Sequence, residues 1–109
     1  MNLTKEKIND FSVININGRI DSTNYAEFEK QINQLFSSGE TNIIINCKEL
    51  KYISSSGLRV FLIARKKATA VNGKLHLCEM HPSIKEIFVI SGFSTIFDIF
   101  ETMEEALQQ

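Results

Sequence analysis

The sequence predicts an α/β domain built on a mixed, mostly parallel sheet of four or five strands, with an N-terminal antiparallel hairpin and about four helices. Two observations carry this prediction: strand-like and helix-like patterns alternate along the chain, and a hairpin pattern opens it. The length of 109 residues allows one compact hydrophobic core and is short for two. We therefore expect a single domain that spans residues 1–109.

The segment 11–20 predicts the second strand of the opening hairpin. Ile14 and Ile16 alternate there with asparagines, which is the period of a strand with one covered face. The turn-favouring pair Asn9 and Asp10 comes directly before this segment. An antiparallel partner is therefore expected among residues 3 to 9.

Apolar residues next take helical spacing, which predicts an amphipathic helix packed on the sheet. The residues of this stripe are Tyr25, Phe28, Ile32, Leu35 and Phe36. Asn24 and Glu27 have the spacing of a capping box, and Gly39 supplies the stop.

The middle of the chain predicts a buried parallel strand followed by a long helix. The run 42–47 is apolar and β-branched, as is typical of a central strand covered on both faces. One helix is expected from Ser55 to Val71, ended by Asn72 and Gly73. Its first half is apolar almost all round, so it is buried or faces a partner.

The last third of the chain continues the alternation of strands and helices. We expect a strand over 74–79, a short helix with Ser83 and Glu86 as its capping box, a strand over 93–100, and a terminal helix capped by Thr102 and Glu105.

Composition excludes several classes of partner. With 12 basic and 13 acidic residues, the net charge of -1 gives no general attraction to nucleic acid or to an anionic membrane. No apolar run reaches the roughly 20 residues of a membrane helix, and the N-terminus lacks a signal peptide core. We expect a cytoplasmic protein with protein partners. Cys47 and Cys78 are then reduced core residues, with a disulfide between neighbouring strands as the alternative.

A serine cluster stands where the buried strand gives way to the long helix. Amides of the first helical turn lack intrahelical acceptors, and the helix dipole adds partial positive charge, so an anion on Ser55 is favoured there. Helix capping needs only one serine, yet Ser54, Ser55 and Ser56 follow one another. Gly57 then leaves room for another protein to approach. Ser55 is therefore a candidate phosphate-carrying switch, with simple capping as the alternative.

Enzyme activity finds little support in the sequence. The nucleophile elbow of an α/β-hydrolase needs glycine two residues before the serine, where Ile53 or Ser54 stands. The two histidines, His76 in a strand and His81 in a loop, are not placed as a general base. The chain also lacks a Gly-rich phosphate loop and paired carboxylates. We expect no catalytic residue, metal or cofactor.

Two motifs resemble the STAS-domain family, in particular the bacterial anti-sigma factor antagonists. Residues 18–21 (Gly-Arg-Ile-Asp) resemble the family's Gly-x-Leu-Asp, and residues 52–58 resemble its aromatic-aliphatic-Asp-Ser-Ser-Gly-Leu segment. The resemblance covers nearly the whole chain and implies the STAS fold. One position departs from the motif: Ser54 stands where the family usually has an acidic residue.

The resemblance implies a regulatory role. Ser55 matches the serine that a partner, an anti-sigma factor with serine kinase activity, phosphorylates with its own ATP and magnesium. The unmodified antagonist binds the anti-sigma factor and frees the sigma factor; phosphorylation ends this binding, and a serine phosphatase restores it. The chain is then a substrate and not an enzyme. The partner-binding surface is expected to comprise Asp21, Ser54, Ser56, Gly57, Leu58 and Arg59.

Alternatives remain for the site and for the whole protein. Asp21 also fits a turn or a helix cap, and Arg59 has no family role and faces a partner or solvent. A STAS scaffold subunit of a transport or signalling assembly, without the switch, is the second hypothesis. A serine hydrolase or phosphate-binding protein is the third.

Overall fold

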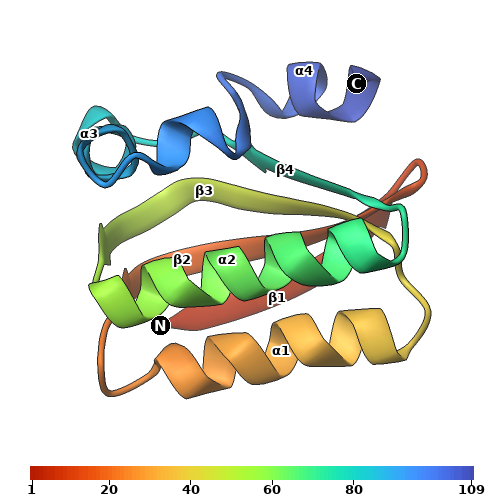
Figure 1. Cartoon of the computed structure of the whole chain (residues 1–109), viewed down its shortest axis with the longest axis horizontal. Helices are drawn as coiled ribbons and strands as arrows, with labels where there is room; N and C mark the ends of the chain where they lie inside the picture. The colour runs from red at the N-terminus through yellow and green to blue at the C-terminus, as the bar shows by residue number, and fades with distance from the viewer.

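One five-stranded sheet organises the computed structural model, which describes residues 1–109 (Figure 1). The elements in chain order are β1 (Asn2–Ile8), β2 (Phe11–Ile20), α1 (Tyr25–Ser37), β3 (Asn42–Ile53), α2 (Ser55–Ala70), β4 (Lys74–Cys78), α3 (Pro82–Ile90), the 3-10 turn η1 (Phe93–Thr95), β5 (Asp98–Phe100) and α4 (Met103–Gln108). The strand order is β1-β2-β3-β4-β5, with β1 antiparallel to β2 and every other pair parallel. The predicted α/β fold is confirmed.

Helices cover both faces of the sheet, but unequally. The larger core cluster joins Phe28 of α1 and Phe61 of α2 to inward side chains of the strands. The smaller cluster lies under α4, where Ala106 packs with Val13 and Ile44. Figure 1 shows α1 and α2 along one side of the sheet and α4 on the other. The apolar first half of α2 is therefore buried inside the protein.

Phe61 anchors α2 at the centre of an aromatic cluster. Its ring centroid lies 5.4 Å from Phe28, 5.5 Å from Phe88 and 6.4 Å from Phe97. These partners come from α1, α3 and the segment between η1 and β5. Because aromatic pairs at such separations add about 0.5–1.5 kcal/mol each beyond area burial, α2 is held firmly on the sheet.

The predicted helix starts are only partly right. Thr102 and Glu105 form the expected capping box of α4. Asn24 lies at the N-cap of α1, but its side chain makes no cap hydrogen bond. Instead it accepts from the Asp21 amide at 2.9 Å and donates to the Arg19 carbonyl at 3.0 Å, which ties the loop back to β2.

The predicted capping box of the short helix α3 is wrong. Pro82 occupies the first turn, so His81 is the N-cap residue and its side chain makes no cap hydrogen bond. Ser83 lies one position inside the helix and is not placed to cap it. Proline suits this position, since the missing N–H has no intrahelical partner there in any case.

Strand lengths differ from the predicted ones in two places. β3 continues to Ile53, beyond the apolar run 42–47. Its second half pairs with β2 alone and carries exposed polar residues, so no apolar run marks it in the sequence. β5 comprises only Asp98–Phe100, since Phe93–Thr95 forms the turn η1 and Phe93 packs on the aromatic cluster. The apolar pattern over 93–100 therefore marks core packing as well as a strand.

Both cysteines are free and buried, as predicted. Cys47 packs in the larger core cluster and Cys78 in the smaller one, so the two thiols occupy different parts of the core. Burial raises the pKa of both thiols, that of Cys78 to about 12, and so keeps them protonated. No helix combines the length and the apolar character needed to cross a membrane.

Candidate functional site

The junction between β3 and α2 is fixed by backbone and side-chain hydrogen bonds. The Ser54 amide donates to the Ile20 carbonyl at 2.9 Å, which joins the junction to the end of β2. The Ser54 hydroxyl accepts from the Gly57 amide at 3.2 Å and so caps α2. The position that follows, residue 55, is therefore presented on a rigid support.

Ser55 is exposed and its hydroxyl makes no hydrogen bond within the protein. It is the first residue of α2, whereas its neighbours Ser54 and Ser56 are half-buried. Helix capping therefore explains the serine at position 54 but not the serine at position 55. The dipole and free amides of the first turn favour negative charge at this end of the helix.

Asp21 lies beside the serine cluster because β2 and β3 are parallel and end together. Ile20 pairs with Ile53, so the residues that follow them meet at one edge of the sheet. The Asp21 carboxylate accepts from the Thr23 hydroxyl at 2.6 Å and from the Thr23 amide at 2.9 Å. These bonds, with the nearby charge of Arg19, lower the pKa of Asp21, so its negative charge persists in mildly acidic solution. The turn role considered for Asp21 is therefore present.

Gly57 and Leu58 are buried and offer no open side-chain surface. A Cβ added to Gly57 would lie 2.8 Å from side-chain carbons of both Ile20 and Ile53. The glycine thus lets α2 pack against the ends of β2 and β3. Our explanation that Gly57 leaves room for a partner is wrong, because the space beside its Cα is filled from inside the protein.

Arg59 faces solvent on the second turn of α2. Together with Ser55 and the half-buried Asp21, Ser54 and Ser56, it gives this edge an accessible polar surface. Four of the six residues expected at the partner-binding surface, and Ser55 itself, are thus at least partly open to solvent.

Arg19 and Tyr52 form a pair at the same edge of the sheet. The sequence analysis included both residues only as members of the two motifs and assigned them no contact. They face each other across the β2–β3 ladder, and the Arg19 guanidinium carbon lies 4.4 Å from the centre of the Tyr52 ring. Tyr52 is 39% exposed. Each residue stands directly before the isoleucine that ends its strand, and this matched spacing is the signal that could have found them.

Neither histidine contacts Ser55. The Nδ1 atom of the buried His76 lies 2.8 Å from the Ala106 carbonyl oxygen, and Nε2 of His81 lies 2.7 Å from the Lys48 carbonyl oxygen. No group of three His, Cys, Asp or Glu side chains is arranged to hold a metal ion. Ser55 therefore presents an accessible hydroxyl with no histidine in contact with it.

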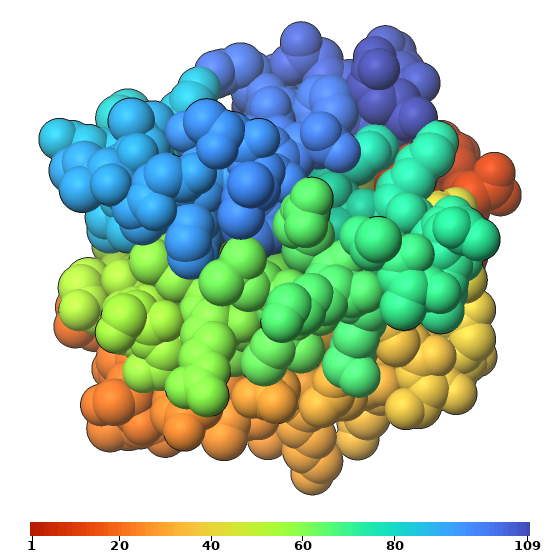
Figure 2. All heavy atoms as spheres, in the orientation of Figure 1, coloured from red at the N-terminus to blue at the C-terminus, as the bar shows by residue number.

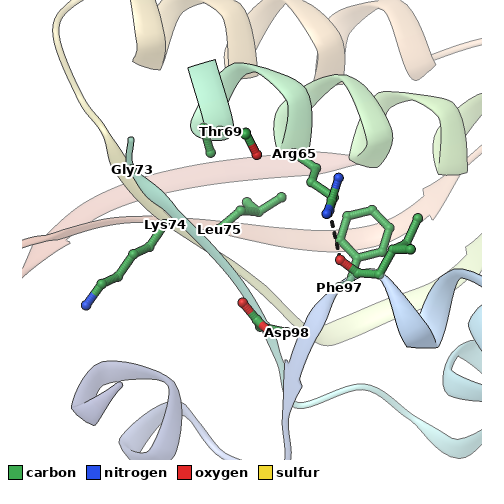
Figure 3. Close-up of a pocket in the computed structure, with 9 residues that line it drawn as sticks. Arg65, Thr69, Gly73, Lys74, Leu75, Phe97 and Asp98 are labelled. Atoms are coloured by element: carbon green, nitrogen blue, oxygen red, sulfur yellow. Dashed lines mark hydrogen bonds between the residues drawn. The ribbon is translucent and has the colours of Figure 1, made fainter. Parts of the chain in front are cut away.

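A separate cavity of about 240 Å³ lies near the other end of α2 (Figure 3). Arg65 and Thr69 line it from α2, Lys74 and Leu75 from β4, and Asp98 from β5. The Arg65 side chain donates from Nε to the Ile96 carbonyl at 2.8 Å. Thr69 is about 20 Å from Ser55 along the helix axis, so this cavity is distinct from the surface that carries Asp21 and Ser55.

Comparison with known proteins identifies the family of this chain and several of its relatives. The STAS domain family matches residues 2–106. Over 106 residues the chain is 37% identical to the candidate anti-sigma factor antagonist BtrV of Bordetella bronchiseptica, covering 97% of this chain and 91% of that protein.

Solved structures with this fold include a candidate anti-sigma factor antagonist from Thermotoga maritima, with a TM-score of 0.92 and 18% identity over 97% of this chain and 92% of that one. The Bacillus cell fate determinant SpoIIAA in its phosphorylated form gives a TM-score of 0.75 and 26% identity, over 98% of this chain and 97% of that one. With the family match extending over nearly all of its residues, the chain belongs to the STAS domain family.

Proposed function

We propose that this protein is an anti-sigma factor antagonist of the cytoplasm. In its unmodified form it docks on an anti-sigma factor through the edge formed by Asp21, Ser54, Ser55, Ser56 and Arg59, and so releases the sigma factor for transcription. One observation carries the proposal: an exposed serine without hydrogen bonds, at the β3–α2 junction, in a chain 37% identical to a candidate antagonist. The protein acts by binding and not by catalysis.

Phosphorylation of Ser55 is the proposed off-switch. The anti-sigma factor is itself the serine kinase and uses its own ATP and magnesium, and a serine phosphatase returns the protein to the binding form. A phosphate adds about two negative charges at neutral pH. The N-terminus of α2 tolerates this charge. An interface closed over Ser55 does not, because it would have to desolvate the phosphate.

Phosphate mapping tests the proposal directly. The kinase is recovered from the native cell by pull-down with wild-type and Ser55→Asp baits, then incubated with ATP and the wild-type, Ser55→Ala or Ser54→Ala protein. Mass spectrometry is expected to find phosphate on Ser55 in the wild type and in Ser54→Ala, and none in Ser55→Ala. Phosphate on another residue, or the absence of both modification and binding, contradicts the proposal.

A STAS scaffold without the switch is the second candidate. The observation that favours it is the neutral Ser54 directly before Ser55, where the family motif has an acidic residue. In that case Ser55→Asp leaves the affinity for the partner unchanged, as isothermal titration calorimetry would detect.

A further inference from the structure

A cationic side chain lies one helical turn after Ser55 on α2. Ser55 and Arg59 are four positions apart in this helix, and both are exposed. Residues at this spacing are neighbours on a helix surface, with about 5–6 Å between their Cβ atoms. Figure 2 shows α2 as a green band on the surface of the molecule, between the orange of α1 and the blue of the chain after β4. This helix therefore has an open outer side.

The direction of helical side chains brings Arg59 toward Ser55. Each Cα–Cβ bond of an α-helix tilts toward the N-terminus, so a long side chain covers the turn that precedes its own Cα. For Arg59 that turn begins at Ser55, the first residue of α2. An anion followed by a cation four residues later is also the more favourable order of charges along a helix.

The Arg59 guanidinium makes no hydrogen bond or ion pair within the protein. Tyr25 and Glu29 of α1 line a small cleft together with Arg59, yet no ion pair joins Glu29 to it. At the end of β3, the Lys51 ammonium pairs with the Glu49 carboxylate at 3.6 Å. The five donors of the Arg59 guanidinium are thus left for a group that the unmodified chain does not contain.

The other charged groups at this edge are already in contact with neighbours. The Asp21 carboxylate accepts from the hydroxyl and the amide of Thr23. The Arg19 guanidinium lies over the Tyr52 ring, 4.4 Å from its centre. Arg59 is therefore the arginine of this edge that can turn to a new anion without giving up a contact.

We propose that a phosphate on Ser55 is bound by Arg59 of the same chain. The phosphate brings three acceptor oxygens, and the guanidinium presents a planar fork of donors that matches two of them. The inference rests on the proposed function, in which Ser55 carries this phosphate. Phosphorylation then changes the docking edge twice, because it adds the charge at Ser55 and withdraws the free guanidinium of Arg59.

The test uses the isolated chain of 109 residues, with phosphoserine incorporated at position 55 through a reassigned codon. Phosphorus NMR follows the second ionisation of the phosphate, whose ordinary pKa is about 6. A guanidinium in contact favours the dianion and so lowers this pKa. Arg59→Gln is therefore expected to raise it by about 0.2–0.4, as for an exposed pair at this spacing.

Two further variants control this measurement. Arg19→Gln removes the other arginine of the edge and is expected to raise the pKa of the phosphate clearly less than Arg59→Gln does. Arg59→Lys should restore part of the lowering, since it keeps the charge but lacks the planar fork. Thermal unfolding checks that each variant is folded. An equal pKa in the wild type and Arg59→Gln, or a larger effect of Arg19→Gln, overturns the inference.

The outcomes separate this inference from the proposed function, because the NMR experiment needs neither a kinase nor an anti-sigma factor. If the recovered kinase modifies Ser55 and Arg59→Gln leaves the pKa of the phosphate unchanged, the inference alone fails. If Arg59→Gln raises this pKa but the kinase leaves Ser55 unmodified, Arg59 binds the phosphate as inferred and the proposed switch fails.

Discussion

Adjacent serines at the start of α2 have different physical roles. The Ser54 hydroxyl accepts the Gly57 amide and caps the helix, while the Ser55 hydroxyl has no partner in the protein. A local pattern of three serines cannot distinguish these roles, because any of them could be the N-cap until the first helical residue is known. Ser54 thus has a structural role, whereas the Ser55 hydroxyl is not needed for the fold.

Alanine substitutions are expected to distinguish the roles of Ser54 and Ser55 in stability. Ser54→Ala should lower the free energy of unfolding by about 1 kcal/mol, since it leaves an amide of the first turn without its acceptor. Ser55→Ala should change it by less than about 0.5 kcal/mol, because no hydrogen bond is lost. Urea unfolding followed by circular dichroism measures both. Equal losses in the two variants would show that Ser55 shares the capping role.

Asp21 predicts a defined pH response. Hydrogen bonds from Thr23 lower its pKa in the folded protein, so the stabilisation they give is present above the unfolded pKa of about 3.9 and is lost as pH falls through the lower folded value. We expect an NMR titration of the Asp21 carboxyl to have a midpoint below about 3.9. Thr23→Val should move it upward, since the hydroxyl donor is removed; an unmoved midpoint would assign the lowered pKa to another cause.

At the scale of elements, helix and strand identity follows from the sequence better than their ends do. The helical stripe of α1 and the apolar run of β3 were sufficient to locate these elements, because each pattern reflects one buried face. The ends depend on contacts that a local pattern does not contain. The Asn24 side chain is used by the loop before it, and the polar second half of β3 is held by pairing with β2.

Packing of α2 against the strand ends predicts an effect of Gly57→Ala. The new Cβ would press on Ile20 and Ile53, which are 0% and 3% exposed and have little room to move. Overpacking costs about 1–3 kcal/mol, and the helix preference of alanine returns at most about 1 kcal/mol. A net loss of about 1–2 kcal/mol in urea unfolding is therefore expected. A gain in stability would mean that α2 can shift outward freely.

On the scale of the whole molecule, the candidate site depends on residues far apart in the chain. The motifs at 18–21 and 52–58 meet because β2 and β3 run parallel and end together. The sequence contains both motifs and predicts a mostly parallel sheet. From these two observations one could predict that Asp21 and Ser55 lie close together. The Arg19–Tyr52 pair could not be predicted, since it requires the register of the two strands.

A charge at position 55 is expected to change binding without changing the fold. Ser55→Asp should leave the free energy of unfolding unchanged or raise it by up to about 1 kcal/mol, because a carboxylate suits the start of a helix. Its affinity for the anti-sigma factor should fall by at least about tenfold in isothermal titration calorimetry. Ser55→Asn, similar in size and neutral, is the control. Equal losses for both variants would indicate a steric effect of size.

The hydrogen bond from the Ser54 amide to the Ile20 carbonyl bears on how the proposed phosphorylated form would differ from the unmodified one. With the backbone held on both sides of position 55, we expect a phosphate there to leave the backbone in place, so that the proposed partner would distinguish the two forms by the charge and bulk of the added group. Concentrated salt, which shortens the Debye length to about 3 Å at 1 M, should therefore narrow the gap between their affinities.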